Sequence, residues 1–260
     1  MPIAKMTQSA PSRFQKLSRK WKHSMLKRRI MLEDFLRPKV MRCISQNQYY
    51  DTYQADRTTW DRVRDEFRKE ICVANSADPE VLLSLVQKLQ PENFLEIGTF
   101  RGGTAAAVKM VSPATEVFTI NHPLPENLIN PLERDQIGIA FRRRGQDVKL
   151  LWADSAELLE LDIPLCDMIF VDGDHSRDAV MRDFRNCWRL LKPGGYMLFH
   201  DFIPPSLPTR PFHTRYVVSA YRQFSRSHKH EFADAFHVTG SWLGVVSKRL
   251  QEPARTRIAA

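Results

Sequence analysis

The first stretch of the chain places apolar residues at helical spacing among basic ones. Five large apolar side chains fall on one face of the expected helix, and the pattern ends at Pro38: these are Phe14, Leu17, Trp21, Met25 and Leu32. Lysine and arginine occupy much of the remaining surface, which is the pattern of a basic amphipathic helix. We expect its apolar face to pack on the rest of the protein or on a second subunit, with contact to a membrane surface or RNA through residues 1–40 as the alternative.

From residue 78 onward, short apolar runs alternate with stretches of helical period. Asp78 followed by Pro79 is typical of a helix N-cap and first helical residue. Apolar runs predict strands at 93–97, 117–120, 148–152, 168–171, 196–199, 231–236 and 242–247, with helices at 133–143, 155–160, 177–191 and 214–226. Because crossover helices join parallel strands, this order predicts an α/β fold. We expect a Rossmann-like doubly wound, mostly parallel seven-stranded sheet with a C-terminal antiparallel hairpin and an N-terminal helical extension.

The charge distribution and the residues that break helices and strands divide the chain into three parts. These are a basic helical N-terminal extension over 1–75, a Rossmann-like domain over 76–250 and a tail over 251–260. The net charge of +9 is concentrated at the start. Residues 1–50 hold twelve Lys and Arg against two acidic residues, whereas the remainder holds 27 basic and 28 acidic residues. A nearly neutral domain argues against nucleic-acid binding by the domain itself.

The cysteines and the hydropathy favour a cytoplasmic protein. No stretch approaches the ~20 consecutive apolar residues that a membrane-spanning helix needs. The four cysteines are too dispersed for a CxxC pair, and we expect reduced thiols at Cys43, Cys72, Cys166 and Cys187. Peripheral membrane association through the basic helix is left open.

A glycine-rich turn, EIGTFRGG at residues 96–103, follows the first strand of the alternating region. In open α/β sheets ligands bind beyond the carboxyl ends of the strands, and glycines at Gly98 and Gly102 let the backbone turn sharply and approach a ligand. A nicotinamide site would show GxGxxG and a later acidic residue. Here Phe100 takes the middle glycine position and Asn121 ends the second strand.

The turn resembles the ExGxxxG turn of class I S-adenosylmethionine (SAM)-dependent methyltransferases. In that family the acidic residue belongs to the cofactor site and the turn approaches the methionine portion. The resemblance implies cofactor contacts from Glu96, Gly98, Gly102 and Thr104.

The same resemblance extends to the ends of the next two strands. The family contacts the adenine after its third strand, which implies contacts from Asp154 and Ser155, although either residue could instead cap the helix that begins there. Asn121 stands where the family has an acid that holds the ribose hydroxyls. An amide also hydrogen-bonds a hydroxyl, so Asn121 is retained as a cofactor residue.

Two neighbouring strands further along end in acidic and imidazole side chains. The segments are FVDGDHS at 170–176 and LLKPGGYMLFHDF at 190–202. Since parallel strands end at one edge of a sheet, we expect five side chains to meet beside the glycine turn, namely Asp172, Asp174, His175, His200 and Asp201.

These segments resemble the methyltransferase 24 group and related small-molecule O-methyltransferases, over roughly residues 78–250. In catechol-type enzymes the acids that end these strands bind a divalent metal, and a base lies just after the first acid. The resemblance implies metal ligands at Asp172 and Asp201 and a catalytic base at His175. If no metal is needed, Asp172 and His175 would instead form an acid–base pair.

One ligand of that metal site is missing here. Phe202 replaces a ligating amide of the family, so His200 or Asp174 would have to complete the shell. Oxygen ligands suit Mg²⁺, and a histidine among them also admits Mn²⁺ or Fe²⁺. Four other histidines show no ligand spacing and are expected on the surface or in packing: His213, His228, His230 and His237.

We therefore expect a SAM-dependent methyltransferase that methylates a hydroxyl of a small molecule or glycan, with or without a divalent cation. One alternative is a catalytically degenerate scaffold, which Asn121 and Phe202 would signal. An RNA methyltransferase using the basic arm is another, against which the absence of a (D/N)PP(Y/F) tetrapeptide counts. A nicotinamide oxidoreductase or a hydroxylase on the same fold is the last. The sequence leaves open the acceptor and whether the protein is a homo-oligomer.

Overall fold

The computed structural model describes residues 13–37, 39–56, 58–67, 77–123, 134–205 and 211–250, and it forms two units that divide between Pro38 and Lys39. The first unit is the helix α1 (Arg13–Leu36), as the apolar spacing predicts. The side chains of Phe14 and Leu17 lie outside the described residues. Within the described ranges no helix is both long and apolar enough to cross a membrane.

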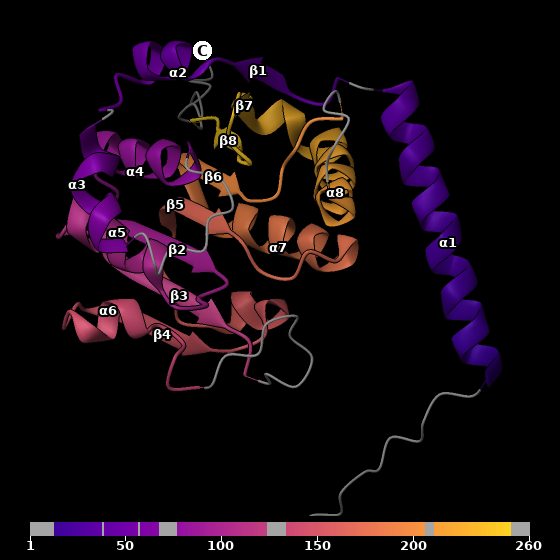
Figure 1. Cartoon of the computed structure of the whole chain (residues 1–260), viewed down its shortest axis with the longest axis horizontal. Coiled ribbons are helices and arrows are strands. Elements are labelled where there is room, and N and C mark those ends of the chain that lie inside the picture. The colour runs from indigo at the N-terminus through magenta and orange to yellow at the C-terminus, as the bar shows by residue number, and fades with distance from the viewer. Residues whose placement is uncertain are drawn as a thin grey trace, which may run out of the picture. The chain divides into compact units, whose positions relative to one another are not determined.

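The second unit is built on one eight-stranded sheet in the order β1-β7-β8-β6-β5-β2-β3-β4 (Figure 1). The strands are β1 (Arg42–Ile44), β2 (Asn93–Ile97), β3 (Glu116–Asn121), β4 (Val148–Trp152), β5 (Cys166–Val171), β6 (Leu191–Phe199), β7 (Phe232–Val238) and β8 (Gly244–Lys248). Neighbours pair in parallel except where β8 meets β6 and β7. The predicted parallel sheet with a C-terminal antiparallel hairpin is confirmed.

The predicted strand number was one too low. The additional strand, β1, lies within the segment assigned to the N-terminal extension and pairs in parallel with β7. It has only three residues, of which Ile44 alone is buried. Such a short run carries no period-2 pattern, which is why hydropathy missed it.

Helices cover both faces of the sheet. They are α2 (Gln46–Tyr53), α3 (Thr58–Phe67), α4 (Ala77–Leu89), α5 (Gly103–Val111), α6 (Ile139–Arg143), α7 (Arg177–Leu190) and α8 (Phe212–His228), with the 3₁₀ helices η2 (Ser155–Glu160) and η3 (Lys229–Glu231). The helix expected over 133–143 is limited to Ile139–Arg143, because Gly138 precedes it in the left-handed conformation with φ +70°. The described part of that segment before Gly138 forms a turn.

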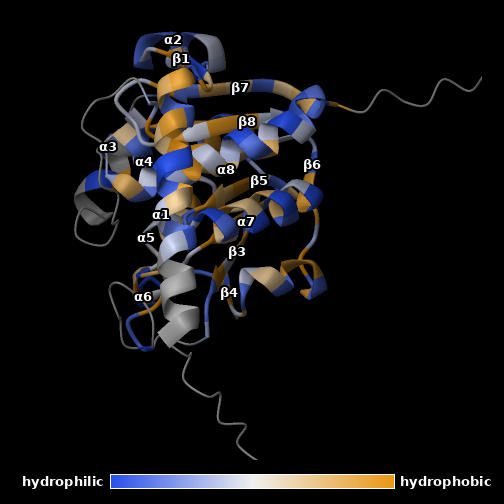
Figure 2. Ribbon diagram, turned by 90° about the vertical axis from the view of Figure 1, so that its right-hand side faces the viewer, coloured by the Kyte–Doolittle hydropathy of each residue, from blue (hydrophilic) through white to orange (hydrophobic). Residues whose placement is uncertain are grey.

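Two apolar cores follow from the alternation of side chains along the strands, whose buried runs appear orange in Figure 2. Leu95 and Ile97 of β2 pack on the face covered by α7 and α8. Phe94, in the same strand, packs on the face covered by α4 and α5. A sheet buried on both faces gives the nearly continuous apolar strands seen in the sequence.

Described residues between the boundary found at Pro38 and the boundary predicted at residue 75 contribute to the second core. Ile44, Tyr49 and Val63 pack in the cluster that contains α4 and α5. The hydroxyl of Tyr49 donates a hydrogen bond of 2.8 Å to the carbonyl oxygen of Val81. The described residues from 39 to 67 therefore pack with the sheet unit, whereas the sequence placed them in the extension.

Candidate active site

The carboxyl ends of the three neighbouring strands β5, β2 and β3 form one row. Ile97 of β2 pairs with Val171 of β5 on one side and with Ile120 of β3 on the other. Backbone hydrogen bonds continue this row past the strands, from the Gly98 amide to the Ile120 carbonyl at 2.9 Å and from the Asp172 amide to the Ile97 carbonyl at 2.8 Å. The strand order reverses at β2, where open α/β sheets bind their ligands.

The glycine turn fits tightly against the end of β5. Gly98 has φ +100°, and a Cβ there would lie 2.1 Å from the Asp172 carbonyl oxygen. Gly102 has φ +76° and precedes α5, where a Cβ would lie 2.5 Å from the Phe141 ring. Both positions therefore require glycine, and the free amides of the first turn of α5 begin at the same edge of the sheet.

Glu96 is buried beneath this turn, with 2% of its surface exposed. The Thr119 hydroxyl donates a 2.6 Å hydrogen bond to its carboxyl group, and Thr119 also lies 2.8 Å from the Thr99 hydroxyl. Burial raises the pKa of Glu96 to about 8, although hydrogen bonds from Thr119 and Thr104 oppose the shift. The carboxyl group is therefore mostly neutral at pH 7 in the protein without ligand.

The residues expected near the adenine and ribose end the next two strands. Asn121 is partly exposed at the end of β3 and donates to the His122 carbonyl at 3.1 Å. Asp154 caps η2 by accepting a 2.8 Å hydrogen bond from the Ala156 amide, and Ser155 is the first residue of that helix. The structure thus shows the capping role of Asp154. The other carboxylate oxygen of Asp154, Oδ2, lies 3.8 Å from His122 Nε2.

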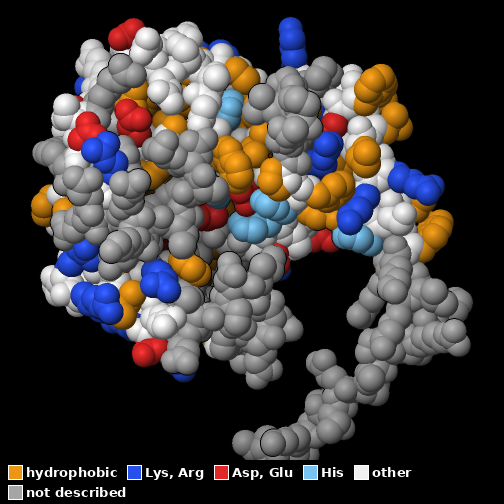
Figure 3. Space-filling model, in the orientation of Figure 1, with side chains coloured by type: hydrophobic (Ala, Val, Ile, Leu, Met, Phe, Trp, Pro, Cys, Tyr) orange, Lys and Arg blue, Asp and Glu red, His pale blue; other side chains and the backbone are white. Residues whose placement is uncertain are grey.

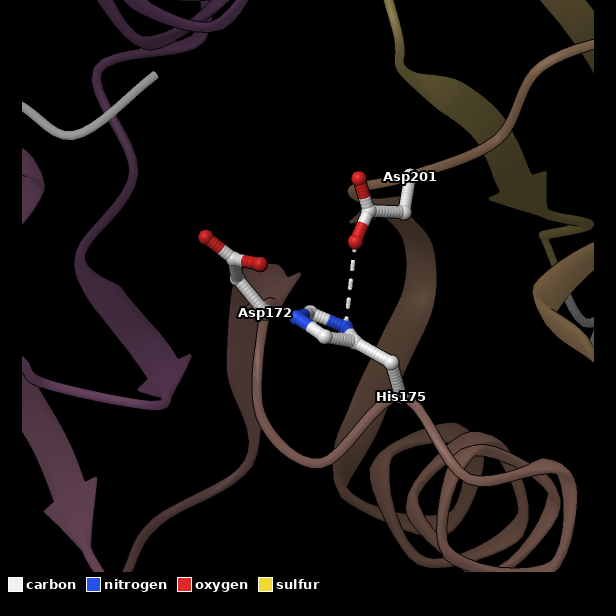
Figure 4. Close-up of side chains that lie close together, drawn as sticks. All are labelled: Asp172, His175 and Asp201. Carbon is white, nitrogen blue, oxygen red and sulfur yellow. Dashed lines mark ion pairs between the residues drawn. The ribbon is translucent and has the colours of Figure 1, made fainter. Parts of the chain in front are cut away.

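Asp172, His175 and Asp201 form a compact cluster at the ends of β5 and β6. Each residue offers one atom that could ligate a metal ion, and these three atoms lie within 4.8 Å of one another. His175 Nδ1 is 3.1 Å from Asp201 Oδ2. Figure 4 shows the imidazole between the two carboxyl groups, with Asp172 on the side away from Nδ1.

His200 lies behind this cluster and points toward the α4 face. Its Nε2 is 3.2 Å from Asp78 Oδ2, and its Nδ1 is 3.3 Å from Asp172 Oδ1 and 3.4 Å from Asp201 Oδ1. Burial disfavours the charged imidazole, but the surrounding carboxylates outweigh it and raise the pKa of His200 well above its usual value. Likewise, burial disfavours the Asp172 carboxylate, but His200 outweighs it and lowers its pKa.

Asp78 has a role that the sequence did not reveal. It lies inside α4 and is 1% exposed, so it is not the helix N-cap that was predicted. Its Oδ1 accepts a 2.6 Å hydrogen bond from the Trp242 amide, while Oδ2 faces His200. A local Asp-Pro signal cannot show a partner that lies 122 residues away.

His213 also joins the cluster, contrary to the expectation that it serves only the surface or packing. Its Nε2 lies 3.5 Å from Asp201 Oδ1, and its ring centre lies 5.6 Å from that of His175. It is the second residue of α8. Figure 3 shows histidine side chains gathered beside acidic ones on this face of the protein.

Two residues named with the metal site lie elsewhere. Asp174 is exposed and accepts hydrogen bonds from the amide and the hydroxyl of Ser176, at 2.8 and 3.0 Å. Phe202 is fully buried against Phe199 and Tyr221 in the apolar core. The position of the family's ligating amide therefore contributes packing here, and the nitrogen atoms beside the two carboxyl groups belong to histidines.

This part of the chain matches a known protein family. Residues 95–202, which contain the glycine turn and both acidic strand ends, match the model of a methyltransferase domain, methyltransferase 24. This match covers less than half of the chain and makes residues 95–202 similar to a methyltransferase domain. An uncharacterized protein of Acanthamoeba polyphaga mimivirus is 27% identical over 112 residues, which are 42% of this chain and 51% of that protein. The chain thus matches about half the length of this curated relative.

Solved methyltransferase structures share the fold of this domain. A methyltransferase of Podospora anserina bound to S-adenosylhomocysteine (SAH) has a TM-score of 0.54 at 16% identity, over 95% of this chain and all of that chain. The O-methyltransferase TomG of Streptomyces achromogenes, in complex with SAM, has a TM-score of 0.50 at 18% identity, over 78% of this chain and 95% of that chain. These similarities establish the methyltransferase fold.

Proposed function

We propose that this protein transfers the methyl group of SAM to a hydroxyl oxygen of a small-molecule acceptor. The observation that carries the proposal is that the glycine turn and the Asp172–His175–Asp201 cluster follow neighbouring strands of one sheet. A cofactor in the turn and an acceptor hydroxyl at the cluster would then lie side by side. Structures of similar fold that hold SAH or SAM support the choice of cofactor.

The cofactor is expected along the row from β2 to β4. The methionine portion would lie at Gly98, Gly102 and Thr104, above the carboxyl group of Glu96. The ribose and adenine would lie at Asn121 and at Asp154 with Ser155. These residues follow three consecutive strands in the sheet order, which gives an extended ligand one continuous edge.

His175 has the geometry of a general base. With Nδ1–H donated to Asp201, its Nε2 carries the lone pair, as in other dyads in which a carboxylate orients an imidazole. In the reaction Nε2 takes the hydroxyl proton while the acceptor oxygen attacks the methyl carbon. The carbon–sulfur bond breaks, and its electron pair stays on sulfur to give SAH. Because a neutral hydroxyl is a poor nucleophile at pH 7, this proton removal accelerates the transfer.

A second candidate role for the same cluster is to hold a divalent cation. Two carboxyl groups and one imidazole within 4.8 Å fit such an ion, and His213 is adjacent. Asp172 and Asp201 would be its ligands, with a histidine nitrogen. When bound, the ion would lower the pKa of the acceptor hydroxyl.

Calorimetry on the purified full chain tests the cofactor. SAM and SAH should bind, and NAD should not. If neither sulfur cofactor binds or protects against thermal unfolding, the chain is a scaffold and the proposal is wrong.

A panel of phenols, sugars and other hydroxyl compounds with radiolabelled SAM then tests the chemistry. For an acceptor found in this way, His175→Ala should lower the rate by about 10²- to 10⁴-fold with unchanged SAH affinity. His230→Ala, a change at an exposed imidazole, serves as the control. Undiminished turnover by His175→Ala would exclude the base.

Chelation separates the two candidate roles of the cluster. If a cation is required, a chelator should stop turnover and Asp201→Ala should lose the metal, whereas His175→Ala should retain SAH binding. Full activity in chelator would eliminate the cation and leave the His175–Asp201 dyad.

A further inference from the structure

Helix α1 exposes more large apolar side chains than any other element in the described part of the chain. Six of the ten exposed large apolar residues lie on it: Trp21, Met25, Met31, Leu32, Phe35 and Leu36. Trp21 and Phe35 are 66% and 82% exposed. Single exposed apolar residues need no explanation, but a concentration of this kind on one helix marks an interaction surface.

The six residues form one stripe. At 100° per residue they fall within an arc of about 140° around the helix axis. Lys22 and Arg29 border the stripe, and Arg28 lies within it. Over its whole length α1 contains eight Lys and Arg residues and two acidic ones. The apolar stripe and the positive charge therefore coincide on one surface.

We propose that α1 is an interfacial helix that lies on an anionic membrane surface, with the stripe in the headgroup region and the basic side chains at lipid phosphates. Amphipathic helices with Trp, Phe and Leu on one face and Lys and Arg around it bind in this way. The helix is not apolar enough to span the bilayer. This proposal is independent of the proposed methyl transfer. Membrane binding by α1 would bring the domain to acceptors at a lipid surface.

Charge complementarity selects this occupant over two others. A second copy of α1 would place basic residues against basic residues across the contact. RNA would satisfy the charges, and its bases could stack on the aromatic rings, but it would leave the aliphatic side chains of Met25, Met31 and Leu32 in water. An anionic bilayer satisfies both sets of side chains, and each Lys or Arg near the surface adds to its attraction.

Sedimentation of the full chain with vesicles tests the proposal. Binding should be at least about tenfold stronger to phosphatidylcholine vesicles that contain phosphatidylglycerol than to pure phosphatidylcholine, and it should weaken as salt increases. The double variant Trp21→Ser, Phe35→Ser should lose vesicle binding because it removes apolar contacts. The double variant Lys22→Gln, Arg29→Gln should lose vesicle binding because it removes positive charge. The matched control is Leu159→Ser, Leu165→Ser, which removes two exposed leucines of the sheet unit and should bind like the wild type.

These measurements distinguish membrane binding by α1 from a folding defect, from RNA binding and from self-association. SAH binding and circular dichroism of each variant show whether the domain is intact, so a folding defect is recognised. Equal loss of vesicle binding in the control variant would overturn the assignment to α1. Binding to RNA but not to vesicles would overturn it in favour of nucleic acid. Concentration-dependent self-association that Trp21→Ser, Phe35→Ser abolishes, without vesicle binding, would show that the stripe joins two copies.

Discussion

Replacing Glu96 with glutamine should change how the stability of the protein depends on pH. The Glu96 carboxyl group is 2% exposed, and burial raises its pKa to about 8. Glutamine has nearly the same shape as the neutral carboxyl group, and its oxygen can still accept the hydrogen bond from Thr119. Glu96→Gln therefore removes the ionisation and retains the packing.

The sign and the size follow from proton linkage. The unfolded chain releases the Glu96 proton near pH 4.5, whereas the native state keeps it up to about pH 8. Between these values the native state binds more protons than the unfolded state, so this residue's contribution to the free energy of unfolding falls as pH rises. The slope is about 1.4 kcal/mol per pH unit, or about 5 kcal/mol over the window. Below pH 4.5 the contribution is fully present, and above pH 8 its loss is complete.

Urea denaturation of both proteins at several pH values between 5 and 8.5 measures the effect, with SAM and SAH absent. Other titrating groups contribute equally to both proteins, so the difference in free energy of unfolding isolates Glu96. The free energy of unfolding of Glu96→Gln, relative to that of the wild type, should increase steadily up to about pH 8 and then stay constant. Glu157→Gln, at an exposed glutamate, is the control. A difference for Glu96→Gln that does not change with pH would refute the assignment of a neutral buried carboxyl group.

Three further changes test other parts of the structure. Gly98→Ala should cost at least about 2 kcal/mol of unfolding free energy and weaken SAH binding, because φ is +100° and the new Cβ would clash with the Asp172 carbonyl; calorimetry would show this. Asp78→Asn should cost about 2 kcal/mol in urea denaturation by weakening the contact with His200. Deleting residues 1–38 should move the Tm by less than about 5 °C in calorimetry, since the sheet unit begins at Lys39.

The sheet could be predicted because its signal is local. Each buried strand between residues 93 and 199 is an apolar run that ends in turn-forming or acidic residues, and crossover helices require the strands to be parallel. The strand β1 could not be found in this way. Its three residues are held by pairing with β7, almost 200 positions later, and only Ile44 is buried.

The candidate site shows the same limit at the level of single side chains. Asp172, His175 and Asp201 could be placed together because each follows a strand whose neighbours were predictable. His213 could not, because it reaches Asp201 from the first turn of α8, after a proline-rich segment with no ligand spacing. Its position depends on how α8 crosses the sheet, which no local pattern specifies.

Asp78 is the most instructive case because its local pattern was correct and its function was not. Asp before Pro is a strong helix-start signal, and a helix does begin there. A buried carboxyl group needs hydrogen-bond partners, however. Helix α4 would supply a backbone amide as a partner only if the Asp78 side chain capped the helix. The Trp242 amide and the His200 imidazole, which lie 164 and 122 residues later in the chain, contact the two carboxylate oxygens. The contact with Asp78 fixes the direction of His200, which in turn lies against Asp172 and Asp201. Helix α4 therefore orients the cluster at the ends of β5 and β6.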